Sequence, residues 1–217
     1  MSQINIIDHP FRRRMLAKIK NNHDFDYHYF DNPKMLTGFR GFHEHGNVAE
    51  GERDFKQEAR DIFNIENINT ALDVGCAKGF LVRELRKLGV DAEGIDASEY
   101  AIDHCPNEIR PFLHQMNIIE ISTEKKYDII HCSSVLMYLT LSDLQDVLKR
   151  FHIIATKGII VDVPTKEEIL DGYNKKDNAY LDPLRKQELS QKEWDNLLLD
   201  AEFRKAENVL HGYYEKV

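Results

Sequence analysis

The stretch Ala71-Leu-Asp-Val-Gly-Cys-Ala-Lys-Gly79, followed by Gly94-Ile-Asp96, decides the fold of this chain. An apolar strand ends in an acid, a turn of small residues leads into a helix, and a second apolar strand ends in another acid. In α/β proteins this succession builds a nucleotide-binding pocket at the carboxyl ends of parallel strands. The sequence therefore predicts such a pocket.

The glycine spacing indicates which nucleotide the turn suits. A dinucleotide-binding turn follows the pattern G-x-G-x-x-G, but its three positions hold Gly75, Ala77 and Phe80. The glycines for pyrophosphate approach and for helix packing are therefore absent. The pattern present is Asp73-x-Gly75-x-Ala77-x-Gly79, in which we expect Ala77 to be tolerated if its φ angle is negative.

This turn resembles the D/E-x-G-x-G-x-G turn of class I S-adenosylmethionine-dependent methyltransferases and departs from it only at Ala77. The resemblance covers about residues 71–217 and is best over residues 71–163. It implies an α/β fold with a doubly wound, Rossmann-like, mostly parallel seven-stranded sheet, helices on both faces and an N-terminal helical and aromatic lid. It also implies S-adenosyl-L-methionine as cofactor and S-adenosyl-L-homocysteine as product.

We expect one methyltransferase domain over residues 1–217, with N-terminal helices and the lid at 1–66, the cofactor-binding core at 67–163 and a cap segment with closing antiparallel strands at 164–217. Alternating strands and helices favour a parallel sheet. Expected strands cover residues 70–74, 91–96, 111–115, 127–132, 159–163, 203–209 and 213–217, with Lys157-Gly158 as a turn. We expect Asn47 to cap a helix over residues 48–63 and Ser142 to cap a helix that runs through residue 151. Ser190 is the expected N-cap of a further helix, in a capping pattern with Glu193.

Composition indicates a soluble globular protein. The chain has 217 residues, 42% hydrophobic and 30% charged, and a net charge of −8, which argues against nucleic acid or an anionic membrane as partner. No apolar run approaches the ~20 residues of a membrane span, and no signal peptide is visible. Three cysteines without a C-x-x-C pair predict reduced thiols and a cytoplasmic location.

The resemblance assigns cofactor contacts to the turn and to the ends of the strands. Asp73 would reach the methionine amino group directly or through water. Asp96 would accept both ribose hydroxyls, with Ala97 beside the adenine or ribose, and a helix or turn cap is the alternative for Asp96. The backbone close to the cofactor would be that of Gly75, Cys76, Ala77 and Gly79.

Further candidates follow the third and fourth expected strands. Asn117 stands where the family usually has Asp in a Gly-Asp-Ala turn, and its side-chain oxygen would accept from the adenine amino group, with Ile118 offering its amide. A plain Asn turn is the alternative. Ser133 is expected near the methionine part of the cofactor. His131 is either a general base or a hydrogen-bonded structural histidine.

The segment 131–138 separates subclasses of the family. It lacks the Asn/Asp-Pro-Pro-aromatic motif of DNA and protein amino-methyltransferases and the carboxylates of metal-dependent catechol-type enzymes. The Pro-Cys nucleophile of cytosine-C5 enzymes is also missing, since only Cys105-Pro106 occurs, in reverse order. The small-molecule O- or N-methyltransferase pattern remains.

The aromatic segment 24–47 is the expected lid, and it holds Gly38-Phe-Arg-Gly-Phe-His-Glu-His45. His43 is a candidate base for a hydroxyl acceptor, and two histidines without a third ligand do not predict a metal site. Arg40 between glycines suits a carboxylate or phosphate, and Tyr29 and Arg40 are expected to contact cofactor or substrate. The lid is loosely similar to those of small bacterial methyltransferases acting on phosphonate- or phosphoramidate-type metabolites.

We therefore expect methyl transfer to a small, anionic metabolite, on oxygen, by in-line displacement, in a monomer or homodimer. Two alternatives stay open: methylation of a macromolecule (protein or RNA), and a non-catalytic cofactor-binding regulatory protein of the same fold.

Overall fold

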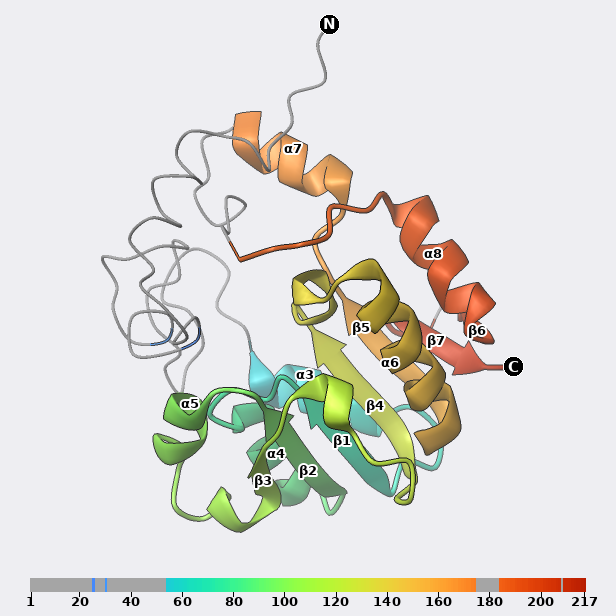
Figure 1. Cartoon of the computed structure of the whole chain (residues 1–217). Helices are drawn as coiled ribbons and strands as arrows, with labels where there is room; N and C mark the ends of the chain where they lie inside the picture. Colours follow the sequence, from blue (N-terminus) through green and yellow to red (C-terminus); the bar gives the residue numbers. More distant parts are fainter. Residues whose placement is uncertain (1–24, 26–29, 31–53, 175–183, 208) are drawn as a thin grey trace, which may run out of the picture.

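The computed structural model describes Phe25, Phe30 and residues 54–174, 184–207 and 209–217. Within these residues, seven strands form one sheet in the order β3-β2-β1-β4-β5-β7-β6 (Figure 1). The first five strands pair in parallel, and β7 runs antiparallel to both β5 and β6. The predicted Rossmann-like fold and its antiparallel finish are therefore confirmed. The strands are β1 (Thr70–Val74), β2 (Asp91–Asp96), β3 (Leu113–Gln115), β4 (Tyr127–Ser133), β5 (Ala155–Asp162), β6 (Phe203–Lys205) and β7 (Tyr213–Lys216).

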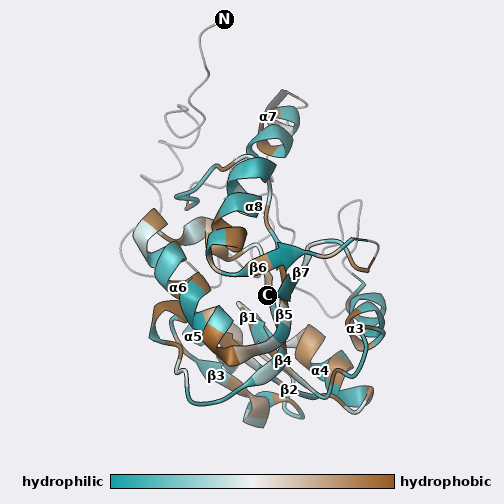
Figure 2. Ribbon diagram, turned by 90° about the vertical axis from the view of Figure 1, so that its right-hand side faces the viewer, coloured by the Kyte–Doolittle hydropathy of each residue, from teal (hydrophilic) through white to brown (hydrophobic). Residues whose placement is uncertain are grey.

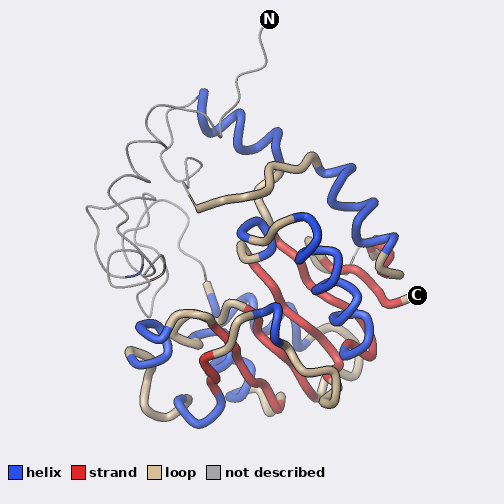
Figure 3. The backbone as a smooth tube through the Cα atoms, viewed as in Figure 1, coloured by secondary structure: helices blue, strands red, loops and turns tan. Residues whose placement is uncertain are grey.

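Helices cover both faces of the sheet (Figure 3). One apolar layer joins β-strand residues such as Leu72 and Ile130 to α6 and α8. The other joins Ala71 and Ile129 to α3 and α4. Figure 2 shows both teal and brown positions along α4 and α6, as expected for helices with one buried face. The helices are α3 (Phe55–Phe63), α4 (Phe80–Lys87), α5 (Glu99–Asp103), α6 (Leu141–Ile154), α7 (Lys166–Asn174) and α8 (Gln191–Asp200), with 3-10 turns η2 (Arg110–Phe112), η3 (Ile118–Glu120) and η4 (Leu136–Tyr138).

Alternation along β1 and β4 matters for the site. Neighbouring residues of a strand point to opposite faces, so Asp73 and His131 point to the same side as Ala71 and Ile129, toward α3 and α4. The two residues are also register partners in the parallel pairing of β1 with β4. The sheet therefore places a carboxylate and an imidazole side by side beneath α3.

Helix starts were predicted with mixed success. The capping box of Ser190 and Glu193 at the start of α8 is present as predicted. The cap of α6 is Thr140 and not Ser142, because the Thr140 hydroxyl accepts a hydrogen bond from the amide of Asp143 at 3.3 Å. The carboxylate of Asp54 caps α3, so this helix begins at Phe55, later than predicted. Residue 47, the other predicted cap, lies outside the described residues.

Two strand boundaries also differ from the prediction. Gly158 lies inside β5 and pairs with both Ile129 and Glu215, so Lys157-Gly158 is not a turn and the strand starts at Ala155. A side chain at position 158 would meet the carbonyl oxygen of Tyr214, which explains the glycine without any turn. The third strand starts at Leu113, because Pro111 belongs to the preceding 3-10 turn.

Among the described helices, none combines the length and the apolar character that a bilayer crossing requires.

Candidate active site

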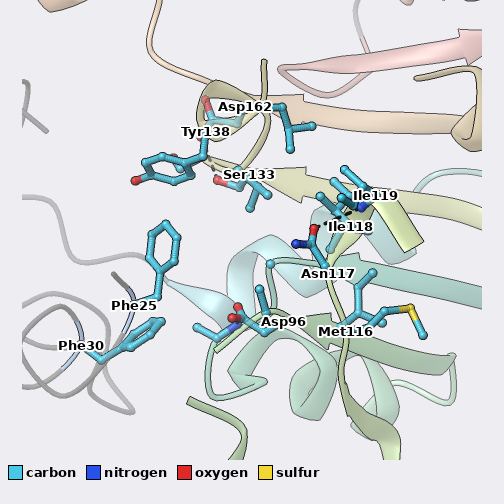
Figure 4. A pocket seen from close by; sticks show the side chains of 18 of the residues that line it. Phe25, Phe30, Asp96, Met116, Asn117, Ile118, Ile119, Ser133, Tyr138 and Asp162 are labelled. Carbon is cyan, nitrogen blue, oxygen red and sulfur yellow. Dashed lines mark hydrogen bonds between the residues drawn. The ribbon is translucent and has the colours of Figure 1, made fainter. Parts of the chain in front are cut away.

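A cavity of about 840 Å³ opens at the carboxyl ends of the central strands. Gly75 follows β1, Asp96 ends β2, Ser133 ends β4 and Asp162 ends β5, and all four line the cavity. Figure 4 shows Ser133, Tyr138 and Asp162 on one side and Asp96 on the other, with Phe25 and Phe30 at the left of the view. The carboxyl edge of a parallel sheet is where this fold binds its ligands, so the sheet supplies the predicted pocket.

The turn after β1 brings its backbone into the cavity. Gly75 has a φ angle of 74°, and a Cβ atom there would meet the side chain of Val135. Ala77 has a φ angle of 49°, so the condition under which alanine was expected to be tolerated, a negative φ, is not met. Its amide donates to Oδ2 of Asp96 at 2.8 Å, which holds this left-handed residue in place. A single alanine in the left-handed conformation lowers the free energy of unfolding by about 1–2 kcal/mol.

Asp96 is a turn cap, one of the two alternatives that the sequence left open, and it also lies at the cavity, where its contact with the ribose stays a prediction. Its Oδ2 accepts from the amide of Ala77 and its Oδ1 from the amide of Ser98, both at 2.8 Å, so the carboxylate caps two local turns. It also lines the cavity. Burial raises the pKa of Asp96, and the two amides oppose that rise. Each carboxylate oxygen has a second lone pair, so the capping bonds leave acceptor capacity for two hydroxyl groups.

The adenine candidates lie together at the same end of the sheet. Ala97, Asn117 and Ile118 all line the cavity, next to Met116 and Ile119. The side-chain oxygen of Asn117 accepts from the amide of Ile119 at 3.3 Å, so the predicted Asn turn exists as well. Ser133 lines the cavity, and its hydroxyl lies 3.4 Å from Oδ2 of Asp162.

Three of the turn residues predicted to contact the cofactor do not line the cavity. The Cys76 side chain packs in the apolar layer beside α4, where burial raises the pKa of its thiol. Gly79 is the N-cap of α4 with a φ angle of 73°, and a Cβ atom there would meet Leu113. Asp73 is 5% exposed, and its Oδ1 lies 2.7 Å from Nδ1 of His131. Asp73 is therefore set back from the cavity lining, and its contact with the methionine amino group, directly or through water, stays a prediction.

His131 is buried and does not line the cavity. Its Nδ1 faces Asp73, and its Nε2 lies 3.0 Å from Oε1 of Glu58. Burial opposes the charge of His131, but Asp73 and then Glu58 outweigh that effect and raise its pKa to about 9. A protonated ring held by two carboxylates is not placed to take a proton from an acceptor in the cavity. The geometry supports the structural alternative for His131 and not the role of general base.

The other lid candidates, Tyr29, Arg40 and His43, lie outside the described residues. Sequence reasoning missed several lining residues on other elements, namely Asp54, Glu58 and Asp61 of α3 and its cap, Tyr138 of η4, Asp162 of β5 and Lys186. The spacing 54, 58, 61 follows one face of a helix and was the available signal for the first three. Among the described residues, no cluster of three or more His, Cys, Asp or Glu side chains is arranged to hold a metal ion.

Comparison with known proteins places this fold and cavity in a class. A family model described as "Methyltransferase domain" matches residues 72–158. No curated protein sequence matches the chain. Solved structures that resemble it include a SAM-dependent methyltransferase from Archaeoglobus fulgidus, with 20% identity, a TM-score of 0.58 and coverage of 77% of this chain and 72% of that one.

Two further structures were crystallised with SAH. Magnesium protoporphyrin IX methyltransferase from Synechocystis PCC 6803 has 16% identity and a TM-score of 0.56, over 77% of this chain and 87% of that one. The plantazolicin methyltransferase BpumL has 21% identity and a TM-score of 0.54, over 67% of this chain and 60% of that one. The chain also spans 54% of a methyltransferase from Clostridium acetobutylicum ATCC 824. At these identities the likeness concerns the fold.

The sheet order defines a Rossmann-like α/β fold, with a cavity at the carboxyl edge where such folds bind their ligands. The family match is more specific about likeness: residues 72–158, about two fifths of the chain, are similar to a methyltransferase domain.

The structure makes a testable prediction for the glycine of the turn. Gly75→Ala should destabilise the protein more than Gly89→Ala, by at least about 1 kcal/mol of unfolding free energy. Both positions have a positive φ, 74° and 90°, but only at position 75 does a Cβ atom meet another side chain, since nothing lies within 4 Å of one at position 89. Urea unfolding of the two variants measures the difference. Equal losses would mean that Val135 moves aside at no cost.

Proposed function

We propose that the chain transfers the methyl group of S-adenosyl-L-methionine to a small-molecule acceptor. The observation that carries the proposal is the cavity that joins the Gly75 turn, the Asp96 carboxylate and the end of β4. In-line displacement at a sulfonium demands alignment of nucleophile, methyl carbon and sulfur more than it demands a reactive side chain. A preformed cavity of this size suits that task.

The cavity supports one orientation of the cofactor. Ala97, Asn117 and Ile118 would surround the adenine, and Asp96 would take the ribose hydroxyls. The methionine part would pass Gly75 toward Ser133, which leaves the acceptor beside Ser133, Tyr138 and Asp162 on the far side of the cavity in Figure 4. These placements follow the family resemblance and agree with the lining of the cavity.

The acceptor itself has two candidates. A small anion methylated on oxygen is the proposal from the sequence, and it relies on Arg40 and His43, outside the described residues. The described lining favours a second candidate, a cationic amine methylated on nitrogen. Among the described lining residues, Lys186 is the one lysine or arginine. Six lining residues carry carboxylates: Asp54, Glu58, Asp61, Asp96, Asp143 and Asp162. Clefts lined with one sign of charge attract ligands of the opposite sign.

Calorimetric titration with S-adenosylmethionine, S-adenosylhomocysteine and NAD tests the cofactor. Micromolar binding of both sulfur compounds without binding of NAD is the expected result. If neither sulfur compound binds, the proposal that the chain uses S-adenosyl-L-methionine is contradicted. Methyl transfer from labelled cofactor to matched sets of small amines and small carboxylates or phosphonates then separates the two acceptor classes. Labelling of proteins or RNA in place of both sets would favour the macromolecular alternative.

A further inference from the structure

A buried row of three charged side chains runs from the sheet to the cavity. Asp73 on β1 contacts Nδ1 of His131 on β4 at 2.7 Å, and Nε2 of His131 contacts Glu58 on α3 at 3.0 Å. The side chains of Asp73 and His131 are 6% and 3% exposed, whereas that of Glu58 is 25% exposed. Of the three, only Glu58 lines the cavity.

The ring of His131 links the two carboxylates of the row. Burial disfavours its protonated form, but the two carboxylates raise its pKa to about 9, so the ring is an imidazolium at neutral pH. Because Asp73 is buried away from the cavity, the row meets the cavity at the carboxylate of Glu58.

The position of the row matches the path of the methionine part of the cofactor. Asp73 stands two residues before Gly75, and His131 stands two residues before Ser133. The row therefore lies directly beneath the two strand ends between which that part would lie under the proposed function. A cation bound there would sit against the cavity-facing end of the row.

We propose that Glu58 binds the α-ammonium group of the cofactor, and that His131 and Asp73 are positioning residues that hold Glu58 in place. This inference rests on the proposed function and moves the contact implied for Asp73 to another residue on another element. An ammonium group donates three hydrogen bonds, and each oxygen of a carboxylate can accept more than one, so a ligand ammonium can share Glu58 with the partners that it already has. The ion pair with His131 fixes the side chain before the ligand arrives.

The test compares S-adenosylhomocysteine with an analogue in which hydrogen replaces the amino group. Wild-type protein should bind S-adenosylhomocysteine at least tenfold more tightly than the analogue. Glu58→Gln should weaken S-adenosylhomocysteine about 10- to 100-fold, as expected for a hydrogen bond between charged groups, and change binding of the analogue less than about threefold. Glu99→Gln, an exposed glutamate of α5, serves as the matched control and should change neither.

A positioning role gives a second signature. His131→Gln should also weaken S-adenosylhomocysteine selectively, and it should add little in the Glu58→Gln background, because its effect passes through Glu58. Equal losses for both ligands, or a wild-type protein that does not distinguish them, would overturn the inference while leaving the cofactor proposal intact. Failure of the wild type to bind either ligand would instead count against the proposed function.

Discussion

Asp96→Ala is expected to weaken binding of S-adenosylhomocysteine about 100- to 20,000-fold. Asp96 lines the cavity at the end of β2, with each carboxylate oxygen already oriented by one backbone amide. A hydrogen bond from a hydroxyl to a charged group contributes about 1.5–3 kcal/mol, and the carboxylate is expected to accept two. At 1.4 kcal/mol for each factor of ten, their loss gives that range. Calorimetric titration at constant salt measures it.

The control for this prediction lies on the same strand. Asp91 is an exposed carboxylate at the opposite end of β2, where it pairs with Arg86, so Asp91→Ala should leave binding within about twofold. An analogue without the two ribose hydroxyls should bind wild type and Asp96→Ala equally well. If Asp96→Ala still binds S-adenosylhomocysteine within threefold of the wild type, Asp96 is only a cap for the turns at Ala77 and Ser98.

Local patterns in the sequence were sufficient to predict most of the core. The apolar runs that become β1 and β2, each ended by an acid, and the alternation of strands with helices determine a parallel sheet with a cavity at its carboxyl edge. The predictions that were wrong concern positions where the local sequence allows more than one structure. Thr140 and Ser142 are both good N-caps, and which of them accepts the hydrogen bond depends on where α6 packs. Gly158 appeared to mark a turn, but packing against β7 requires it.

The site was harder to predict than the fold for a related reason. Asp96 and Ser133 follow their strands directly, so their places at the cavity could be read from strand ends alone. Whether Asp73 faces the ligand depends on the partner it finds across β1 and β4, and this partner is His131. Glu58 comes from a helix whose packing on the sheet is a tertiary property. No spacing in the sequence connects Glu58 with residue 131.

The difference in unfolding free energy between wild type and His131→Gln is expected to shrink by about 2 kcal/mol from pH 6.5 to pH 8.5. Carboxylates face this ring from β1 and α3 and raise its pKa from 6.5 to about 9. A group whose pKa is raised by folding stabilises the folded state most below its unfolded pKa and loses that contribution as the pH rises through the folded value. The full contribution of the buried ring is about 3 kcal/mol, and most of it disappears in this interval.

Urea unfolding at several pH values measures this change, and the comparison with the variant cancels the titration of groups that do not contact His131. Below pH 8.5 the thiols of Cys76 and Cys132 stay neutral in the folded protein, because burial raises their pKa values, so they do not distort the result. A constant difference for His131→Gln would mean that its ring is neutral when folded. Glu58 would then lack the cation that the ligand-binding inference requires.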